Sequence, residues 1–91
     1  MRTGVKGVGP ILHSCPRGRA ILAAIQKLNS GVEVKDRGSY LRVSVPGKCR
    51  VTRAALEEIM GERVHLQMEL EKVMPSFQGQ LSIGDEEATW T

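Results

Sequence analysis

The chain has 91 residues, of which 41% are hydrophobic and 25% charged, a composition typical of one small folded domain and unlike that of a disordered chain. No apolar run approaches the ~20 residues that a membrane-spanning helix needs, and no signal-peptide core follows the N-terminus, so we expect a cytoplasmic protein with no membrane partner. Two cysteines, Cys15 and Cys49, are too few for a disulfide framework, and we expect both to be buried thiols.

The charge of the chain is distributed unevenly between its two parts. Residues 1–53 carry 11 Lys and Arg against two acids, whereas residues 54–91 carry two basic residues against eight acids. The difference leaves a net charge of +3. This polarity is either ordinary solvated surface charge or a means of steering the molecule toward a large charged partner.

The N-terminal part predicts a strand followed by a helix. Residues 1–7 are rich in glycine, and we expect them to be flexible rather than to bind phosphate, because no strand precedes them. Val8 to Leu12 can form a short strand, and Pro16 suits the first turn of a helix that Asn29-Ser30-Gly31 ends. The core-facing positions of that helix recur at helical spacing: Ile21, Leu22, Ile25 and Leu28.

The next segment predicts an antiparallel pair of strands with one solvent-exposed face. Residues 32–35 alternate between valine and charged side chains, and a turn at residues 37–39 leads into Tyr40 to Val45. In this second strand the inward positions are Leu41, Val43 and Val45, and the outward positions are Tyr40, Arg42 and Ser44.

The second half predicts a strand, two helices and a closing hairpin. Cys49 and Val51 continue an inward face, Thr52 caps a helix that Gly61 ends, and a second short helix covers residues 66–73 before Pro75. Residues 77–83 alternate as one strand, and residues 88–90 pair with it after the turn at Gly84-Asp85. The fold class is therefore α+β, a single domain over residues 1–91 with two lobes sharing one core, in the order βαββ followed by βααββ.

No set of residues in the chain predicts catalysis or a cofactor. His13 and His65 are isolated and are expected to be surface or capping residues. Glu57-Glu58 and Glu69-x-Glu71 lack the Glu-x-x-His repeats on facing long helices that a di-iron bundle needs, so we expect them to solvate helix faces. We expect no catalytic residue, no metal site and no cofactor, and hence no enzyme.

An ordered set of short motifs extends over nearly the whole chain. Its pieces are Val8-Gly9-Pro10-Ile11, Asn29-x-Gly31, Asp36-Arg37-x-x-Tyr40-x-Arg42, Thr52-Arg53-x-x-Leu56-Glu57-Glu58, Gly61, Gln67, Glu69-Leu70-Glu71 and Ser76-Phe77-x-Gly79-Gln80. Taken together at near-fixed spacing, they resemble the effector, or coupling, proteins of bacterial soluble di-iron monooxygenases. The resemblance is greatest to the toluene monooxygenase type and extends to the regulatory proteins of phenol hydroxylase and soluble methane monooxygenase.

The resemblance implies a non-catalytic, cofactor-free protein, expected to be monomeric when free, that binds the hydroxylase component over its di-iron site. Such a protein controls substrate and oxygen access, coupling to a ferredoxin or reductase, turnover and regiospecificity. The segment nearest the hydroxylase active site in the family matches the link between the second short helix and the following strand. With an arginine of the first hairpin, this gives the expected interface of Arg42, Val73, Met74, Pro75, Ser76, Phe77, Gln78 and Gly79.

Three of these positions also have structural interpretations, and the chain departs from the family near them. Phe77 could instead fill the core, Gly79 could be an ordinary strand glycine, and Arg42 could be solvated. Met68 resembles a one-residue insertion, so the register of the second helix is open. A second class, a small nucleic-acid-binding module, is suggested by the basic half but opposed by an aromatic content of only 3%.

Overall fold

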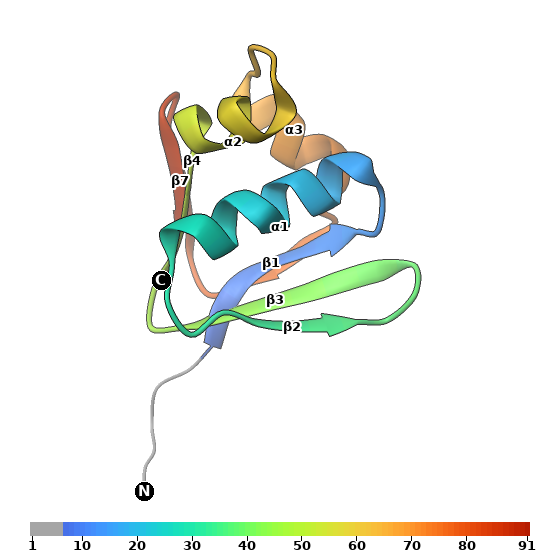
Figure 1. Cartoon of the computed structure of the whole chain (residues 1–91). Helices are drawn as coiled ribbons and strands as arrows, with labels where there is room; N and C mark the ends of the chain where they lie inside the picture. Colours follow the sequence, from blue (N-terminus) through green and yellow to red (C-terminus); the bar gives the residue numbers. More distant parts are fainter. Residues whose placement is uncertain (1–6) are drawn as a thin grey trace, which may run out of the picture.

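Two antiparallel sheets and three helices make up residues 7–91, the part of the chain that this computed structural model describes (Figure 1). The elements in chain order are β1 (Gly7–His13), α1 (Pro16–Leu28), β2 (Glu33–Asp36), β3 (Tyr40–Pro46), β4 (Cys49–Thr52), α2 (Arg53–Met60), α3 (Leu66–Val73), β5 (Ser76–Gln78), β6 (Leu81–Ile83) and β7 (Glu87–Trp90). The expected α+β class is confirmed. The flexibility expected for residues 1–6 lies outside the described residues, and Gly7 already belongs to β1.

The strands form one sheet in the order β2-β3-β1-β5 and a second in the order β4-β7-β6. Helix α1 lies across one face of the four-stranded sheet and also contacts β4, α2 and α3, so that it sits between the two sheets (Figure 1). The other face of the four-stranded sheet carries no helix of residues 7–91. Alternate residues of β3 are buried and solvent-facing, as the sequence predicts.

The helix ends follow local chemistry that the sequence shows. The N–H of Ala55 donates to Oγ1 of Thr52 at 3.1 Å, which makes Thr52 the N-cap of α2. Gly61 ends α2 in the left-handed conformation with φ 73°. His65 precedes α3, and its Nδ1 accepts the N–H of Met68 at 3.4 Å, so His65 has the capping role expected of it.

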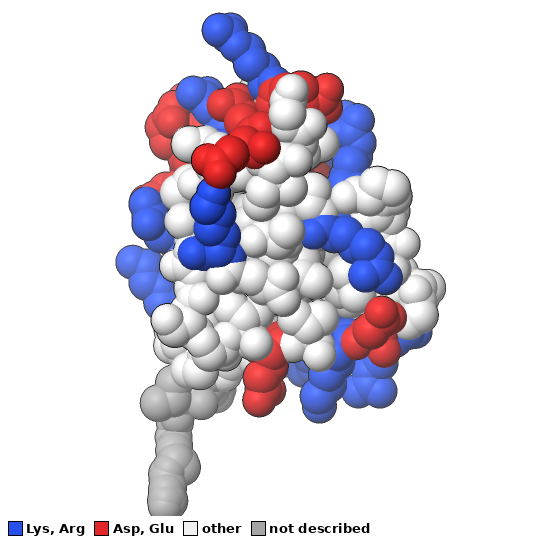
Figure 2. Space-filling view, viewed as in Figure 1, with Lys and Arg blue, Asp and Glu red and all other residues white. Residues whose placement is uncertain are grey.

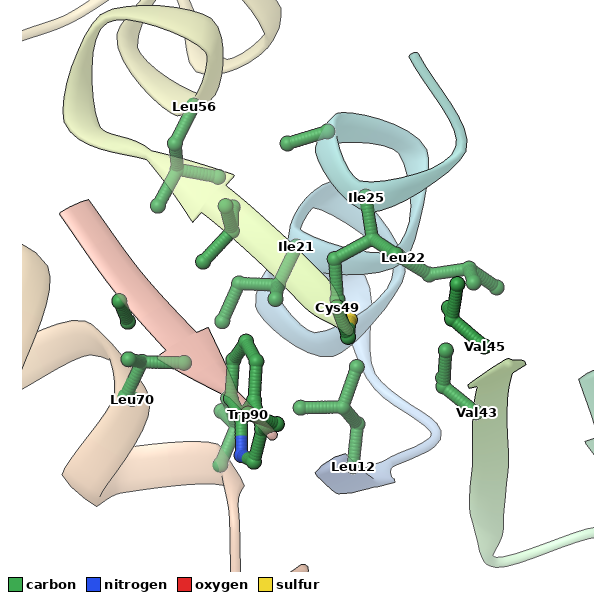
Figure 3. Close-up of a cluster of buried hydrophobic side chains, with 14 of the residues drawn as sticks. Leu12, Ile21, Leu22, Ile25, Val43, Val45, Cys49, Leu56, Leu70 and Trp90 are labelled. Atoms are coloured by element: carbon green, nitrogen blue, oxygen red, sulfur yellow. The ribbon is translucent and has the colours of Figure 1, made fainter. Parts of the chain in front are cut away.

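One hydrophobic core joins the two sheets and the three helices (Figure 3). Its largest fully buried side chains include Trp90, Leu12, Ile21, Ile25, Leu41, Leu56, Leu66 and Leu70. Cys49 is also fully buried, and burial raises the pKa of its thiol to about 12. Cys15, at the start of α1, is only half-buried, so the expectation of two buried thiols is correct for Cys49 alone.

The segment expected to form one strand over residues 77–83 is two strands in different sheets. β5 pairs with β1, whereas β6 pairs with β7. The chain changes sheet at Gly79, which has φ 96° and is followed by a pair of backbone hydrogen bonds between Gln80 and Thr91, at 2.8 and 2.9 Å. The single-strand prediction was wrong because a residue with positive φ interrupts the alternation.

Ion pairs connect the basic first half of the chain to the acidic second half. Five of them do so: Arg17–Glu69, Lys27–Glu58, Arg50–Glu87 at 2.6 Å, Arg53–Glu86 at 2.8 Å and Arg53–Glu57 at 3.8 Å. Part of the charge polarity is therefore used inside the molecule. The Glu69 carboxylate is nearly buried between α1 and α3, where Lys72 also approaches it at 3.8 Å.

Candidate partner interface

The uncovered face of the four-stranded sheet, called here the open face, brings together residues from four separate strands. Arg42 of β3 lies between Lys35 of β2 and Ile11 of β1, and Ile11 in turn lies opposite Ser76 of β5. The open face consists of Glu33, Lys35, Tyr40, Arg42, Ser44, Ile11, His13, Ser76 and Gln78. Along β1 and β3 these side chains alternate with core residues, so the buried positions of these two strands hold this face in place.

One end of the open face is an apolar hollow. Ile11, His13, Ser39, Tyr40 and Pro75 surround a space of about 410 Å³. Tyr40 is 39% exposed although it is a large aromatic side chain, and His13 lies directly opposite it on β1. This end of the face can accept an apolar or aromatic side chain of another protein.

The other end of the open face is polar. Glu33, Lys35, Arg42, Ser44 and Gln78 surround a space of about 180 Å³. Arg42 is half-buried and lines this polar hollow. The open face therefore offers an apolar contact and cationic groups side by side.

Four of the eight residues expected at the interface lie on or beside this face. Arg42, Ser76 and Gln78 belong to it, and Pro75 lines its apolar hollow. β5 thus places Ser76 and Gln78 on the same sheet face as Arg42, with β1 between them, although Arg42 lies more than thirty positions earlier in the sequence. Phe77 lies opposite Pro10 and alternates to the other side of β5, where 41% of its surface is exposed. It does not fill the core.

Core packing and backbone conformation account for the remaining three expected residues. Val73 is 4% exposed and belongs to the core, and Met74, which caps α3 through an N–H bond to the Leu70 carbonyl at 2.8 Å, is half-buried against it. A Cβ atom at Gly79 would lie 2.7 Å from the Thr91 carbonyl oxygen and 2.8 Å from Cγ1 of Val8. Gly79 is required by backbone conformation and by close packing, whatever its role in binding.

Sequence reasoning missed Lys35, Ile11, Ser39 and His13 as neighbours of the expected interface. The alternation of β1 around Leu12 places Ile11 and His13 on the outward side, which was legible in the sequence. Their proximity to Pro75 depends on the pairing of β1 with β5, which no local pattern reveals. Lys35 was legible as an outward residue of its strand but carried no family motif.

The open face gives the nucleic-acid alternative little support. Of the three aromatic residues, Trp90 is fully buried, and Tyr40 and Phe77 lie on opposite sides of the sheet. They cannot form one stacking platform for bases. Among residues 7–91, no group of three or more His, Cys, Asp or Glu residues is arranged to hold a metal ion. No helix in the same range is both long and apolar enough to span a bilayer.

An uncovered sheet face that offers apolar, polar and cationic groups together is suited to binding another protein. The sequence signature of the MmoB/DmpM family matches residues 6–91. The chain belongs to the MmoB/DmpM family, the non-catalytic effector subunits of multicomponent monooxygenases that bind the hydroxylase component. The family expected from the order of motifs is thereby confirmed.

Two individual proteins illustrate the relationship. The chain is 35% identical over 85 residues to the effector subunit of an alkene monooxygenase system from Xanthobacter autotrophicus (strain ATCC BAA-1158 / Py2), an alignment that covers 91% of this chain and 83% of that protein. A chain from a solved phenol hydroxylase–regulatory protein complex superimposes with a TM-score of 0.82 at 16% identity, covering 96% of this chain and 97% of the other. The second similarity concerns the fold alone.

Proposed function

We propose that this protein docks through its open face and the adjoining β5 segment onto a di-iron hydroxylase close to the active site. The observation that carries the proposal is the convergence of Arg42, Ser76 and Gln78, from two distant parts of the sequence, on one uncovered surface of a family member. A rigid sheet positions these side chains more exactly than a loop would.

The proposed mechanism is selective binding. A protein without reactive groups changes an enzyme only by binding one of its conformations more tightly than another. Moving a conformational equilibrium of the hydroxylase from 1:99 to 99:1 requires a preference of about 10⁴-fold. We propose that this preference governs entry of substrate and oxygen, and the timing of electron delivery from a ferredoxin or reductase.

The same proposal extends to the substrate of the partner enzyme and to the oligomeric state and location of this protein. The motifs resemble most the effectors of toluene monooxygenases, and the relative at 35% identity serves an alkene monooxygenase system. We therefore propose a small alkene or aromatic hydrocarbon as the substrate of the partner enzyme. Monomeric behaviour of the free protein and a cytoplasmic location belong to the proposal as well.

The test is a titration of a candidate hydroxylase and its electron-transfer proteins with this protein, following product formation and peroxide release. Product should rise to a maximum near one effector per active site, and peroxide per electron pair should fall. Gln78→Ala should alter the product distribution, whereas Ser82→Ala, an exposed residue of β6 in the other sheet, should not. The proposal would be contradicted if saturating amounts of this protein left the rate, the products and the peroxide release of the hydroxylase unchanged.

A further inference from the structure

We propose that three cations of the β2–β3 hairpin form a receptor for a cluster of carboxylates on the surface of the hydroxylase. These residues, called here the hairpin cations, are Lys35, Arg37 and Arg42. The identity of the partner rests on the proposed function. The chemistry of the site rests on the geometry of the hairpin.

The hairpin cations are held close together by strand register. Lys35 lies directly opposite Arg42 on the neighbouring strand, and both side chains point to the open face. Arg37 follows the end of β2, and its N–H donates to the carbonyl of Tyr40 at 2.9 Å. The backbone therefore fixes the Cα positions of three cationic residues close together on this hairpin.

None of the hairpin cations has a carboxylate partner within 4.0 Å in the described part of the chain, in contrast to Arg17, Lys27, Arg50 and Arg53. Two acids belong to the same hairpin. Asp36 lies 3.5 Å from Arg19, and its Oδ1 also accepts the N–H of Gly38 at 2.9 Å. Glu33 lies opposite Ser44 and lines the same polar hollow as Lys35 and Arg42, so it offsets only part of the positive charge.

Like charges that face each other across two strands destabilise the sheet. The Lys35–Arg42 pair is thus unfavourable in the free protein, and an external anion would relieve the repulsion. A carboxylate suits the site because the planar guanidinium of Arg42 can bind both of its oxygens at once. Because Arg42 is half-buried, its side chain has less freedom to lose on binding than that of a fully exposed arginine.

The surroundings favour carboxylates of a protein over phosphates of a nucleic acid. The hairpin cations adjoin the apolar hollow formed by Ile11, Tyr40 and Pro75, which suits an amino-acid side chain, and no second aromatic residue shares this face with Tyr40 for stacking on bases. Figure 2 shows acidic side chains gathered over the α2–α3 end of the molecule, whereas lysines and arginines are spread around the whole view and have acidic side chains among them at the hairpin end. A negatively charged partner surface would attract the hairpin end first.

The decisive experiment compares Arg42→Gln with Arg63→Gln in binding to the hydroxylase, by calorimetry at several salt concentrations. Arg63 is the matched control because it is an exposed cation at the acidic end, also without a carboxylate within 4.0 Å among residues 7–91. Arg42→Gln should weaken binding by about fivefold at low salt and flatten the salt dependence, while Arg63→Gln should change the Kd less than about twofold. The double variant Lys35→Gln, Arg42→Gln should lose more, without any loss of thermal stability.

Equal effects of Arg42→Gln and Arg63→Gln, or no effect of either, would overturn the carboxylate receptor while the proposed function stands. Binding of single-stranded RNA that is tighter than hydroxylase binding and lost in Arg42→Gln would also overturn it, in favour of a phosphate site. A wild-type protein that does not bind the hydroxylase at all would refute the proposed function itself. The wild-type measurement therefore separates the two failures.

Discussion

The side-chain amide of Asn29 pairs with the backbone of Arg50. Its Nδ2 donates to the Arg50 carbonyl at 2.7 Å, and the N–H of Arg50 donates to its Oδ1 at 3.0 Å. The same Nδ2 donates to the carbonyl of Ile25 at 2.7 Å in the last turn of α1. One side chain thus ends a helix and closes the outer edge of β4, which an unpaired strand would otherwise expose.

Replacing Asn29 by alanine should destabilise the protein by about 1–2 kcal/mol, because three hydrogen bonds of about 1 kcal/mol each are exchanged for bonds to water at a partly exposed site. The free energy of unfolding can be measured in urea from the fluorescence of Trp90, the single tryptophan and a fully buried one. Gln26→Ala, an exposed change in the same helix, is the control. Equal stabilities of the two variants would show that the amide makes no net contribution.

Gly79 and Gly38 provide a matched pair for separating backbone strain from steric conflict. Both have positive φ, 96° and 88°, but a Cβ at Gly38 meets nothing within 4 Å, whereas one at Gly79 meets the Thr91 carbonyl oxygen at 2.7 Å. Gly38→Ala should cost about 1–2 kcal/mol, the penalty of a left-handed alanine. Gly79→Ala should cost clearly more in the same urea experiment. A smaller loss at Gly79 would mean that Thr91 and Val8 move aside easily.

The local features of the fold were predictable because their causes are local. Thr52 and Gly61 bound α2 through a side-chain oxygen and a positive φ, which single residues determine. The outward side of β3 follows from simple alternation. The burial of Val73 is also predictable, because Leu66, Leu70 and Val73 recur at helical spacing. Val73 was nevertheless expected at the interface, because it matches the interface segment of the family.

The parts that sequence reasoning missed depend on contacts between distant residues. Residues 77–83 alternate like one strand, and only the pairing of Gln80 with Thr91 shows where the second sheet takes over. The apolar hollow exists because β5 lies beside β1, which places Pro75 near Ile11. Such neighbours are fixed by the tertiary arrangement and have no counterpart in local periodicity.

The ion pair of Lys27 and Glu58 predicts a specific response to acid. The hydrogen bond from Lys27, and then its charge, lower the pKa of Glu58 below its ordinary value in the folded state. A lowered pKa in the folded state means that the stabilisation is present above the ordinary glutamate pKa and is lost as the pH falls through the lowered one. In Lys27→Met the Glu58 titration, followed by NMR, should move up to an ordinary midpoint.

Lys35→Met is the control for this titration, since Lys35 has no carboxylate partner within 4.0 Å in the described structure. It should leave the midpoint of Glu58 unchanged. High salt should reduce the difference between wild type and Lys27→Met, because both side chains of the pair are largely exposed. If the midpoint of Glu58 were the same in wild type and Lys27→Met, the pair would not form in solution.

The two thiols should react at very different rates. Burial raises the pKa of Cys49 to about 12 and also blocks access to it, whereas Cys15 is half-exposed. In the native protein at pH 8, Ellman's reagent should modify one thiol rapidly, and Cys15→Ser should abolish that reaction. In denaturant both thiols should react. Rapid reaction of the native Cys15→Ser variant would show that the core around Cys49 opens readily.

Position 77 should tolerate proline, because the main-chain N–H and C=O of Phe77 point away from β1, toward the open edge of the four-stranded sheet. Hydrogen-bonding groups alternate along a strand, and the N–H of Ser14 donates to the carbonyl of Ser39, on the β3 side. The main-chain N–H and C=O groups of even-numbered residues of β1 therefore point toward β3, and those of odd-numbered residues point toward β5. Because Gly9 pairs with Gln78, the latter bonds to β1, whereas Phe77 points its N–H outward.

The free energy of unfolding of Phe77→Pro should accordingly lie within about 1 kcal/mol of that of Phe77→Ala, since proline is acceptable where an edge strand turns its N–H to solvent. Gln78→Pro should be destabilised by about 2–3 kcal/mol relative to Gln78→Ala, because it removes a donor that β1 uses. Urea unfolding followed by Trp90 fluorescence measures both differences. Equal penalties at the two positions would mean that β5 pairs with β1 in another register, and that Ser76 and Gln78 do not share the open face with Arg42.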